Sequence, residues 1–253
     1  MPRYKLTLEY DGTPFSGWQR QPHAPSVQAT LEAACLAYCG ADVTAHCAGR
    51  TDAGVHALGQ VAHMDIARGD DGFRVREALN AHLRGSGVVV REAEQVDDSF
   101  HARFSAVRRH YLYRIVHRRA PLALDAQRAW HIPYPLDEDT MREAASYLLG
   151  QHDFTSFRDS ECQAESPIRT LDALDIHRIG EELHLRLHAR SFLHHQVRII
   201  TGTLIEVARG KRSAHAIHDI LKARQRCAAG VTAPAHGLYF THVDYRLSSH
   251  HPS

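Results

Sequence analysis

The sequence predicts an α+β fold built from two related subdomains with mainly antiparallel sheets. Short segments in which apolar and polar residues alternate, the pattern of half-buried strands, recur along the whole chain. Segments with helical spacing of apolar residues interrupt them in a similar order in both halves. No low-complexity linker separates the halves, so we expect packed subdomains at residues 1–103 and 104–246, followed by a flexible tail at 247–253.

The first subdomain is expected to begin with a strand at 4–10, ended by a turn at 11–14. Ser26 is suited to cap a helix that ends at Gly40. A polar loop at 48–54 precedes a strand at 61–66, and a short helix at 75–83 and a strand at 88–90 complete the unit.

The second subdomain is expected to open with a strand at 111–116, followed by a helix at 138–149 and a strand at 183–187. The next helix carries a stripe of apolar residues at near-ideal spacing: Val197, Ile200, Leu204 and Val207. A helix at 214–223 and a strand at 238–245 end the predicted fold.

Bulk composition indicates an ordinary globular protein. The chain has 253 residues, of which 43% are hydrophobic. The N-terminus lacks the apolar core of a signal peptide, and no run approaches the length of a membrane span, so we expect a cytoplasmic protein. The five cysteines have scattered spacing; we expect them to be reduced and mostly buried, and we expect no metal site.

The net charge of +1 conceals two basic clusters, and 27 of the 30 basic residues are arginines. No acid occurs between Ser99 and Leu124, a segment with Arg103, Arg108, Arg109, Arg114, Arg118 and Arg119. The second cluster holds Arg209, Lys211, Arg212, Lys222, Arg224 and Arg226. Either cluster could be a solvated face. The planar guanidinium, however, suits phosphate contact and base stacking, which favours RNA.

Asp52 lies in a polar loop bracketed by Gly49 and Gly54. An Asp close before a Gly is usually a turn former. Arg50 and His56 beside it, and apolar strands on both flanks, instead favour a reactive carboxylate.

Two further motifs offer candidates. Arg109, Tyr111 and Tyr113 share one face of a strand, so the tyrosines are either core residues or a stacking platform beside phosphate-binding arginines. His194 and Arg198 are four apart on a helical face, where a partly buried Arg requires a carboxylate partner. Adjacent helical residues point about 100° apart, so His194 and His195 are not expected to chelate one ion.

These motifs resemble the tRNA pseudouridine synthase A family almost from end to end. The matching runs are 10–13, 17–21, 49–57, 100–106, 109–113, 153–157, 166–170, 192–202 and 237–239. The Gly-Arg-Thr-Asp-Ala-Gly-Val-His run at 49–56 is the most specific. Arg84 stands where the family usually has proline, and Phe240 replaces a commoner aliphatic residue.

The resemblance implies a pseudouridine synthase fold with a central catalytic cleft, and an isomerase that breaks the N1–C1′ bond of uridine and rejoins the base through C5. It implies Asp52 as the essential aspartate, Tyr111 beside the flipped base, Arg198 as partner of the aspartate, and Arg50 in base extrusion. We expect Arg103, Arg109 and His194 to contact RNA as well.

The resemblance also implies that no cofactor or metal is needed, that the enzyme is a homodimer, and that its substrates are uridines of the tRNA anticodon stem-loop, just 3′ of the anticodon. Asp52 could attack C6, attack C1′ or take the C2′ proton; the sequence leaves these paths open.

Two other classes of protein fit the sequence less well. A non-catalytic RNA-binding module would show a glycine-aromatic signature on its strands, and it gives Asp52 no role. A hydrolase with Asp52 as nucleophile or metal ligand usually needs a second carboxylate nearby, and Asp65 lies well down the next strand.

Overall fold

The structure, a computed structural model, describes residues 1–246. The predicted flexible tail at 247–253 lies outside the described residues. The chain forms two compact units, one of residues 1–109 with the chain from 240 onward, the other of residues 110–239. The sequence predicts a domain boundary after residue 103. The compact units divide after residue 109, and the last strand returns to the first unit because it pairs with a strand there.

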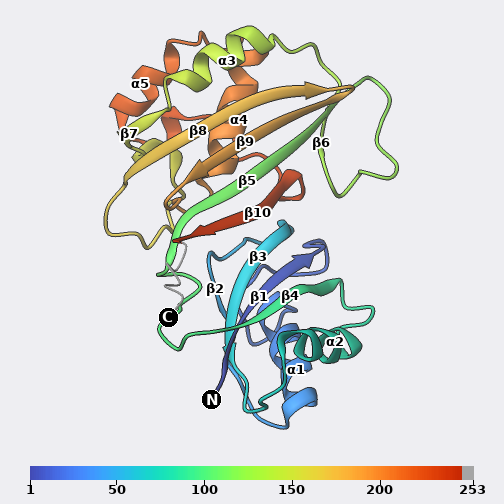
Figure 1. Ribbon diagram of the computed structural model, residues 1–253. Helices are drawn as coiled ribbons and strands as arrows, with labels where there is room; N and C mark the ends of the chain where they lie inside the picture. The colour runs from blue at the N-terminus through green and yellow to red at the C-terminus, as the bar shows by residue number, and fades with distance from the viewer. Residues whose placement is uncertain (247–253) are drawn as a thin grey trace. The chain divides into compact units, whose positions relative to one another are not determined.

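The first unit is built on a sheet with strand order β4-β1-β3-β10, and β2 pairs with β3. Figure 1 shows β1, β3 and β4 side by side. Its ladders β1–β3, β1–β4 and β2–β3 are antiparallel. The predicted alternation of the first strand is confirmed, since Tyr4, Leu6 and Leu8 are completely buried. The strands are β1 (Arg3–Tyr10), β2 (His46–Cys47), β3 (His56–Asp65), β4 (Val88–Val96) and β10 (Leu238–Tyr245).

Two helices, α1 (Val27–Cys39) and α2 (Gly72–His82), pack against each other in this unit, and α2 runs along β4. The predicted cap of α1 is confirmed: the Ser26 hydroxyl accepts a hydrogen bond from the Ala29 amide, and Gly40 ends the helix at φ 72°. Asp71 caps α2 in the same way, accepting from the Arg74 amide at 2.8 Å.

The second unit has the strand order β5-β9-β8-β7, and β6 pairs parallel to β5. The β7–β8 and β8–β9 ladders are antiparallel, so the α+β class with mainly antiparallel pairing is confirmed. The strands are β5 (Ala106–His117), β6 (Trp130–Ile132), β7 (Gly150–Asp153), β8 (Ile168–Ile179) and β9 (Glu182–Ala189). The helices are α3 (Glu138–Ser146), α4 (Gln196–Ala208), α5 (Ala216–Ala223) and the short 3-10 turns η1 (Thr155–Phe157), η2 (Arg226–Ala228) and η3 (Ala235–Gly237).

Helix α4 is enclosed by the second unit. The expected stripe is buried, and so are most other residues of the helix. The buried hydroxyls of Thr201 and Thr203 each donate at 2.8 Å to the carbonyl four residues earlier, so enclosure leaves neither of them unsatisfied. Gly202 permits the close packing, because a Cβ there would lie 1.8 Å from the Val231 carbonyl oxygen.

The expectation that the cysteines are mostly buried is wrong. All five are free thiols, but only Cys35 is buried, and Cys227 is exposed. Scattered spacing indicated the absence of a disulfide framework, but it carries no information about depth in the fold.

Candidate active site

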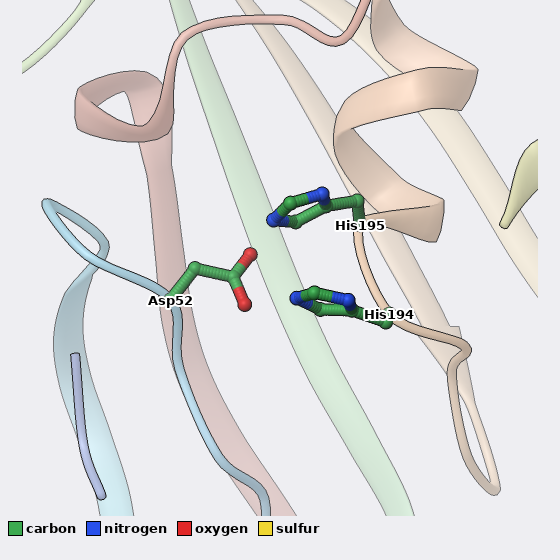
Figure 2. A group of neighbouring side chains, drawn as sticks. All are labelled: Asp52, His194 and His195. Carbon is green, nitrogen blue, oxygen red and sulfur yellow. The ribbon is translucent and has the colours of Figure 1, made fainter. Parts of the chain in front are cut away.

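The loop that carries Asp52 joins β2 to β3 and is held by the main chain on both sides. Asp52 is half-buried, and its carbonyl accepts a hydrogen bond from the Val55 amide at 3.2 Å, which closes a turn. At the start of the loop, the Gly49 carbonyl accepts a hydrogen bond from the side-chain amide of Gln60 at 2.7 Å. Figure 2 shows the Asp52 side chain leaving this loop.

A second segment, residues 10–18, forms the seat of the loop. The Tyr10 hydroxyl lies 2.8 Å from the Thr51 hydroxyl, and both side chains are buried. The Trp18 amide donates to the Thr51 carbonyl at 2.9 Å, and the Gly54 amide donates to the Phe15 carbonyl at 3.3 Å. The residues on both sides of Asp52 are therefore fixed by hydrogen bonds to one neighbouring segment.

Two glycines allow this close approach. A Cβ on Gly12 would lie 2.1 Å from the Val55 carbonyl oxygen, and a Cβ on Gly17 would lie 2.6 Å from the Thr51 carbonyl oxygen. Gly17 also adopts φ +100°, which disfavours any side chain. The Gly12 amide donates to His56 Nδ1 at 3.0 Å, so that nitrogen acts as an acceptor. The sequence motifs at 10–13 and 17–21 thus build the seat of the aspartate loop.

Arg50 belongs to the same loop, two residues before Asp52. Its side chain is exposed and makes no hydrogen bond or ion pair with any residue that the structure describes. The guanidinium therefore requires no rearrangement of a partner before it can contact RNA.

Arg109 has a different placement from the one that we predicted. It is buried, with 9% of its surface exposed, and its guanidinium donates to the backbone carbonyls of Ala48, Ala106 and Arg103. The two bonds to Ala48, at 3.3 and 3.0 Å, reach the residue that begins the Asp52 loop. This placement favours a structural role for Arg109 over contact with phosphate.

The two tyrosines of β5 have different surroundings. Tyr113 is a core residue: it is fully buried, its hydroxyl donates to the Pro234 carbonyl at 2.8 Å, and burial raises the pKa of its phenol. Tyr111 is half-buried and meets Phe192 edge to face, with ring centroids 5.0 Å apart. The sequence left two interpretations of these tyrosines open, core residues or a platform for base stacking. Tyr113 is a core residue, and Tyr111 remains a candidate for stacking on a base.

The start of α4 shows that His194 and His195 do not lie on a helix, contrary to the prediction from the sequence. The helix begins at Gln196, so His194 and His195 precede it, and His195 has a left-handed backbone at φ 59°. Their imidazoles lie against each other with centroids 3.9 Å apart, as Figure 2 shows, instead of diverging as on a helix. The His195 ring is held by Asp159, whose carboxylate oxygen lies 2.8 Å from Nδ1.

Arg198 lies in the first turn of α4. Its Nε donates to the Ala233 carbonyl at 2.8 Å, and the Ala233 amide donates back to the Arg198 carbonyl at 3.1 Å. The guanidinium is thereby oriented by the backbone of the segment that follows η2.

The predicted residues thus fall into two groups. Arg50, Asp52, Arg103 and Arg109 belong to the first unit. Tyr111, His194 and Arg198 belong to the second unit, where Phe192 connects the tyrosine to the segment that leads into α4. Taken unit by unit, the described residues bring no three His, Cys, Asp or Glu side chains to a shared metal-binding point. A metal-free reaction remains a prediction.

Most arginines of the basic clusters have acidic or backbone partners. Arg114 pairs with Glu182 at 2.7 Å and with Asp125 at 3.3 Å, and Arg118 pairs with Glu181 at 3.0 Å. In the second cluster Arg212 pairs with Glu206, Arg224 pairs with Asp153, and Arg226 donates to the Gly230 carbonyl. Glu181, Glu182 and Asp153 lie far along the chain from the arginines that they pair with, so the sequence appears more basic than the folded surface.

A comparison with protein families decides the affiliation of the chain. The model described as tRNA pseudouridine synthase matches residues 7–105 and 144–246, which include the whole Asp52 loop and all of α4. The chain belongs to this family. The described residues contain no helix long and apolar enough to cross a membrane.

Several full-length relatives named tRNA pseudouridine synthase A support the assignment. The one from Rhodopseudomonas palustris (strain BisB5) is 58% identical over 97% of this chain and all of its own length. The relatives from Paramagnetospirillum magneticum and Maricaulis maris are 58% and 57% identical, with 98% and 97% of this chain covered, and 97% and 98% of their own lengths. The chain is also similar to a solved Cbf5-Nop10-Gar1 complex, at 11% sequence identity and a TM-score of 0.37. The match covers 93% of this chain and 57% of that chain.

The residues that sequence reasoning missed are those that seat the loop: Tyr10, Gly12, Gly17 and Gln60. The first three lie inside motifs that match the family, but the motif alone did not show that they touch residues 51–56. Gln60 carries no sequence signal, since one glutamine in an apolar strand has many uses.

Proposed function

We propose that this protein is a tRNA pseudouridine synthase, an isomerase that converts uridine to pseudouridine in the anticodon stem-loop. The observation that carries the proposal is the fixed carboxylate loop: a half-buried Asp52 held by the 10–18 segment, inside the run that matches the family. Full-length relatives that carry this name support the substrate class.

We assign each residue a role from the family resemblance, and its placement supports that role. Asp52 is the reactive carboxylate, at C6, C1′ or the C2′ proton of the nucleotide. A uridine in a stem must leave the stack before any of these atoms can be reached, which costs a few kcal/mol. The exposed Arg50 can fill the gap that the base leaves, and the ring of Tyr111 can stack on the displaced base.

The remaining predicted residues support these roles. Arg198, with its Nε held by the Ala233 carbonyl, is assigned as the basic partner of the carboxylate, as the family resemblance implies. Arg103 and His194 are proposed to contact RNA, whereas Arg109 is now proposed to position the loop through Ala48. We further propose a homodimer that works in the cytoplasm without metal or cofactor.

The test is pseudouridine formation by the purified protein on unmodified tRNA transcripts, mapped by position, with and without EDTA. We expect pseudouridine just 3′ of the anticodon in both reactions. Asp52→Asn should abolish turnover and leave tRNA affinity nearly unchanged, because most of the affinity comes from many phosphate and shape contacts. Product formed by a clean Asp52→Asn preparation would refute the role of Asp52.

A further inference from the structure

The turn between β4 and β5 presents an aromatic ring that the fold does not use. Phe104 is 76% exposed, although it lies within the 100–106 run that resembles the family. Its neighbour Arg103 is also exposed. A single exposed apolar residue is common on protein surfaces, so the geometry around the ring decides whether it has a use.

The turn is held rigidly from several directions. The Ser105 amide donates to the His101 carbonyl at 2.9 Å, and the His101 amide donates to the Ser105 hydroxyl at 2.9 Å. The Ala102 amide donates to His63 Nδ1 at 3.2 Å, and the Ala102 carbonyl accepts from the Tyr245 hydroxyl at 2.8 Å. A mobile loop tip would not need these anchors. The backbone that carries Phe104 is therefore fixed, and the ring is presented on the surface of the turn.

The surroundings of the ring suit a flat, electron-poor partner beside a negative charge. The His101 imidazole lies 4.4 Å from the Phe104 centroid at 37°, and the Arg103 guanidinium carbon lies 5.6 Å from it. These groups support the ring while most of its surface stays accessible. Aromatic rings flanked by arginine are used to stack unpaired bases of single-stranded nucleic acids.

The turn also adjoins the Asp52 loop. The buried Arg109 guanidinium donates to the Arg103 carbonyl and to the Ala48 carbonyl, so one side chain ties the turn to the start of the loop. Arg50 and Arg103 both act electrostatically on Cys47, the residue that precedes Ala48. The turn therefore adjoins the start of the loop that carries Asp52.

We propose that Phe104 is a stacking site for an unpaired base of the bound tRNA, with Arg103 at the adjoining phosphate. The proposal rests on the proposed function, and it names a contact that holds the substrate outside the reacting nucleotide. A stacked base contributes to affinity without adding a charge, so its signature differs from that of a phosphate contact.

The experiment measures the affinity of unmodified tRNA transcripts, as a function of salt, for wild type and Phe104→Ala, Phe104→Trp and Phe73→Ala. Phe73 is the matched control, because it is 67% exposed in the same unit, with Arg76 5.0 Å from its ring centroid. We expect Phe104→Ala to lose affinity on the order of 10-fold with an unchanged salt slope. Phe104→Trp should bind like wild type, as should Phe73→Ala.

Three outcomes would overturn the proposal. Phe104→Ala could bind tRNA as tightly as wild type. It could lose no more tRNA affinity than Phe73→Ala does. It could change only the self-association of the protein, measured by sedimentation, while tRNA affinity stays unchanged. Pseudouridine formation by the wild type is measured in parallel. If the wild type forms none, the proposed function fails; if it forms product and Phe104→Ala still binds normally, only the stacking site fails.

Discussion

The Tyr10 hydroxyl lies 2.8 Å from the Thr51 hydroxyl in the buried base of the Asp52 loop. The Gln60 side chain also donates to the Tyr10 hydroxyl, at 3.4 Å, and to the Gly49 carbonyl. The last residue of β1, Tyr10, is thereby connected to Thr51 directly and to Gly49 through Gln60. Burial raises the pKa of Tyr10, which keeps the phenol protonated throughout the physiological range.

Tyr10→Phe is expected to lower kcat while leaving the KM for tRNA close to its original value. The change leaves the Thr51 hydroxyl with one partner fewer in a buried site, at a cost of about 1–3 kcal/mol in unfolding free energy. Tyr4→Phe is the control: Tyr4 lies on the same strand and its hydroxyl donates to carbonyls of Arg68 and Asp70, away from the loop. Equal losses of kcat in the two variants would show a general effect of stability.

Gly17→Ala tests the close approach of the two segments. The added methyl group would lie 2.6 Å from the Thr51 carbonyl oxygen, so the loop must move. Gly40→Ala is the control, because Gly40 also has a positive φ, at +72°, but has open space around its Cβ position. Both variants should lose about 1–2 kcal/mol of stability from backbone strain. Only Gly17→Ala should lose pseudouridine formation at saturating tRNA, and an active, folded Gly17→Ala would argue against the seat.

Much of the fold was readable from local patterns. The caps of α1, the alternation of β1 and the apolar positions of α4 follow from residues close in sequence, and the structure confirms them. Strand β8 was missed, and its pattern explains why. Its buried residues Leu171, Leu174 and Ile176 break strict alternation, because the β8–β9 register shifts between Leu171 and Ala173.

The candidate site was less accessible to sequence reasoning. Asp52 was identified through a specific run of residues. The guanidinium of Arg109 is bound by three backbone carbonyls, a contact that no side-chain pattern encodes. The arrangement of His194 and His195 depends on where α4 begins, and a shift of the helix start changes which way both rings point. Contacts with backbone and exact helix limits require the folded structure.

Arg119→Ala is expected to weaken binding of all tRNAs alike and to lower the slope of log affinity against log salt by about one. Arg119 is exposed and lies two residues after the end of β5, whereas Arg114, within β5, is held by Glu182 and Asp125. Arg114→Ala should therefore leave the salt slope unchanged and lower thermal stability instead. A slope that responds to Arg114 and not to Arg119 would mean that RNA contacts a different face of the second unit.

Stability is expected to fall between about pH 6.5 and pH 4 because of His63. The ring is 3% exposed, and its Nδ1 accepts from the Ala102 amide, a bond that protonation would remove. The pKa of His63 is lowered from 6.5 to about 4, mainly by burial and also by the nearby His101, Arg3 and His46, while Asp65 opposes the shift.

The unfolded chain binds a proton at His63 at a higher pH than the folded chain does. The stabilisation from the neutral ring is thus complete above pH 6.5 and is lost as the pH falls through 4, about 3 kcal/mol in total. Thermal unfolding of His63→Gln, whose side-chain carbonyl can still accept from Ala102, should show a flatter pH dependence in this window. His82→Gln, at an exposed histidine of α2, should behave like wild type. A profile of His63→Gln that parallels wild type would place the acid sensitivity at other groups.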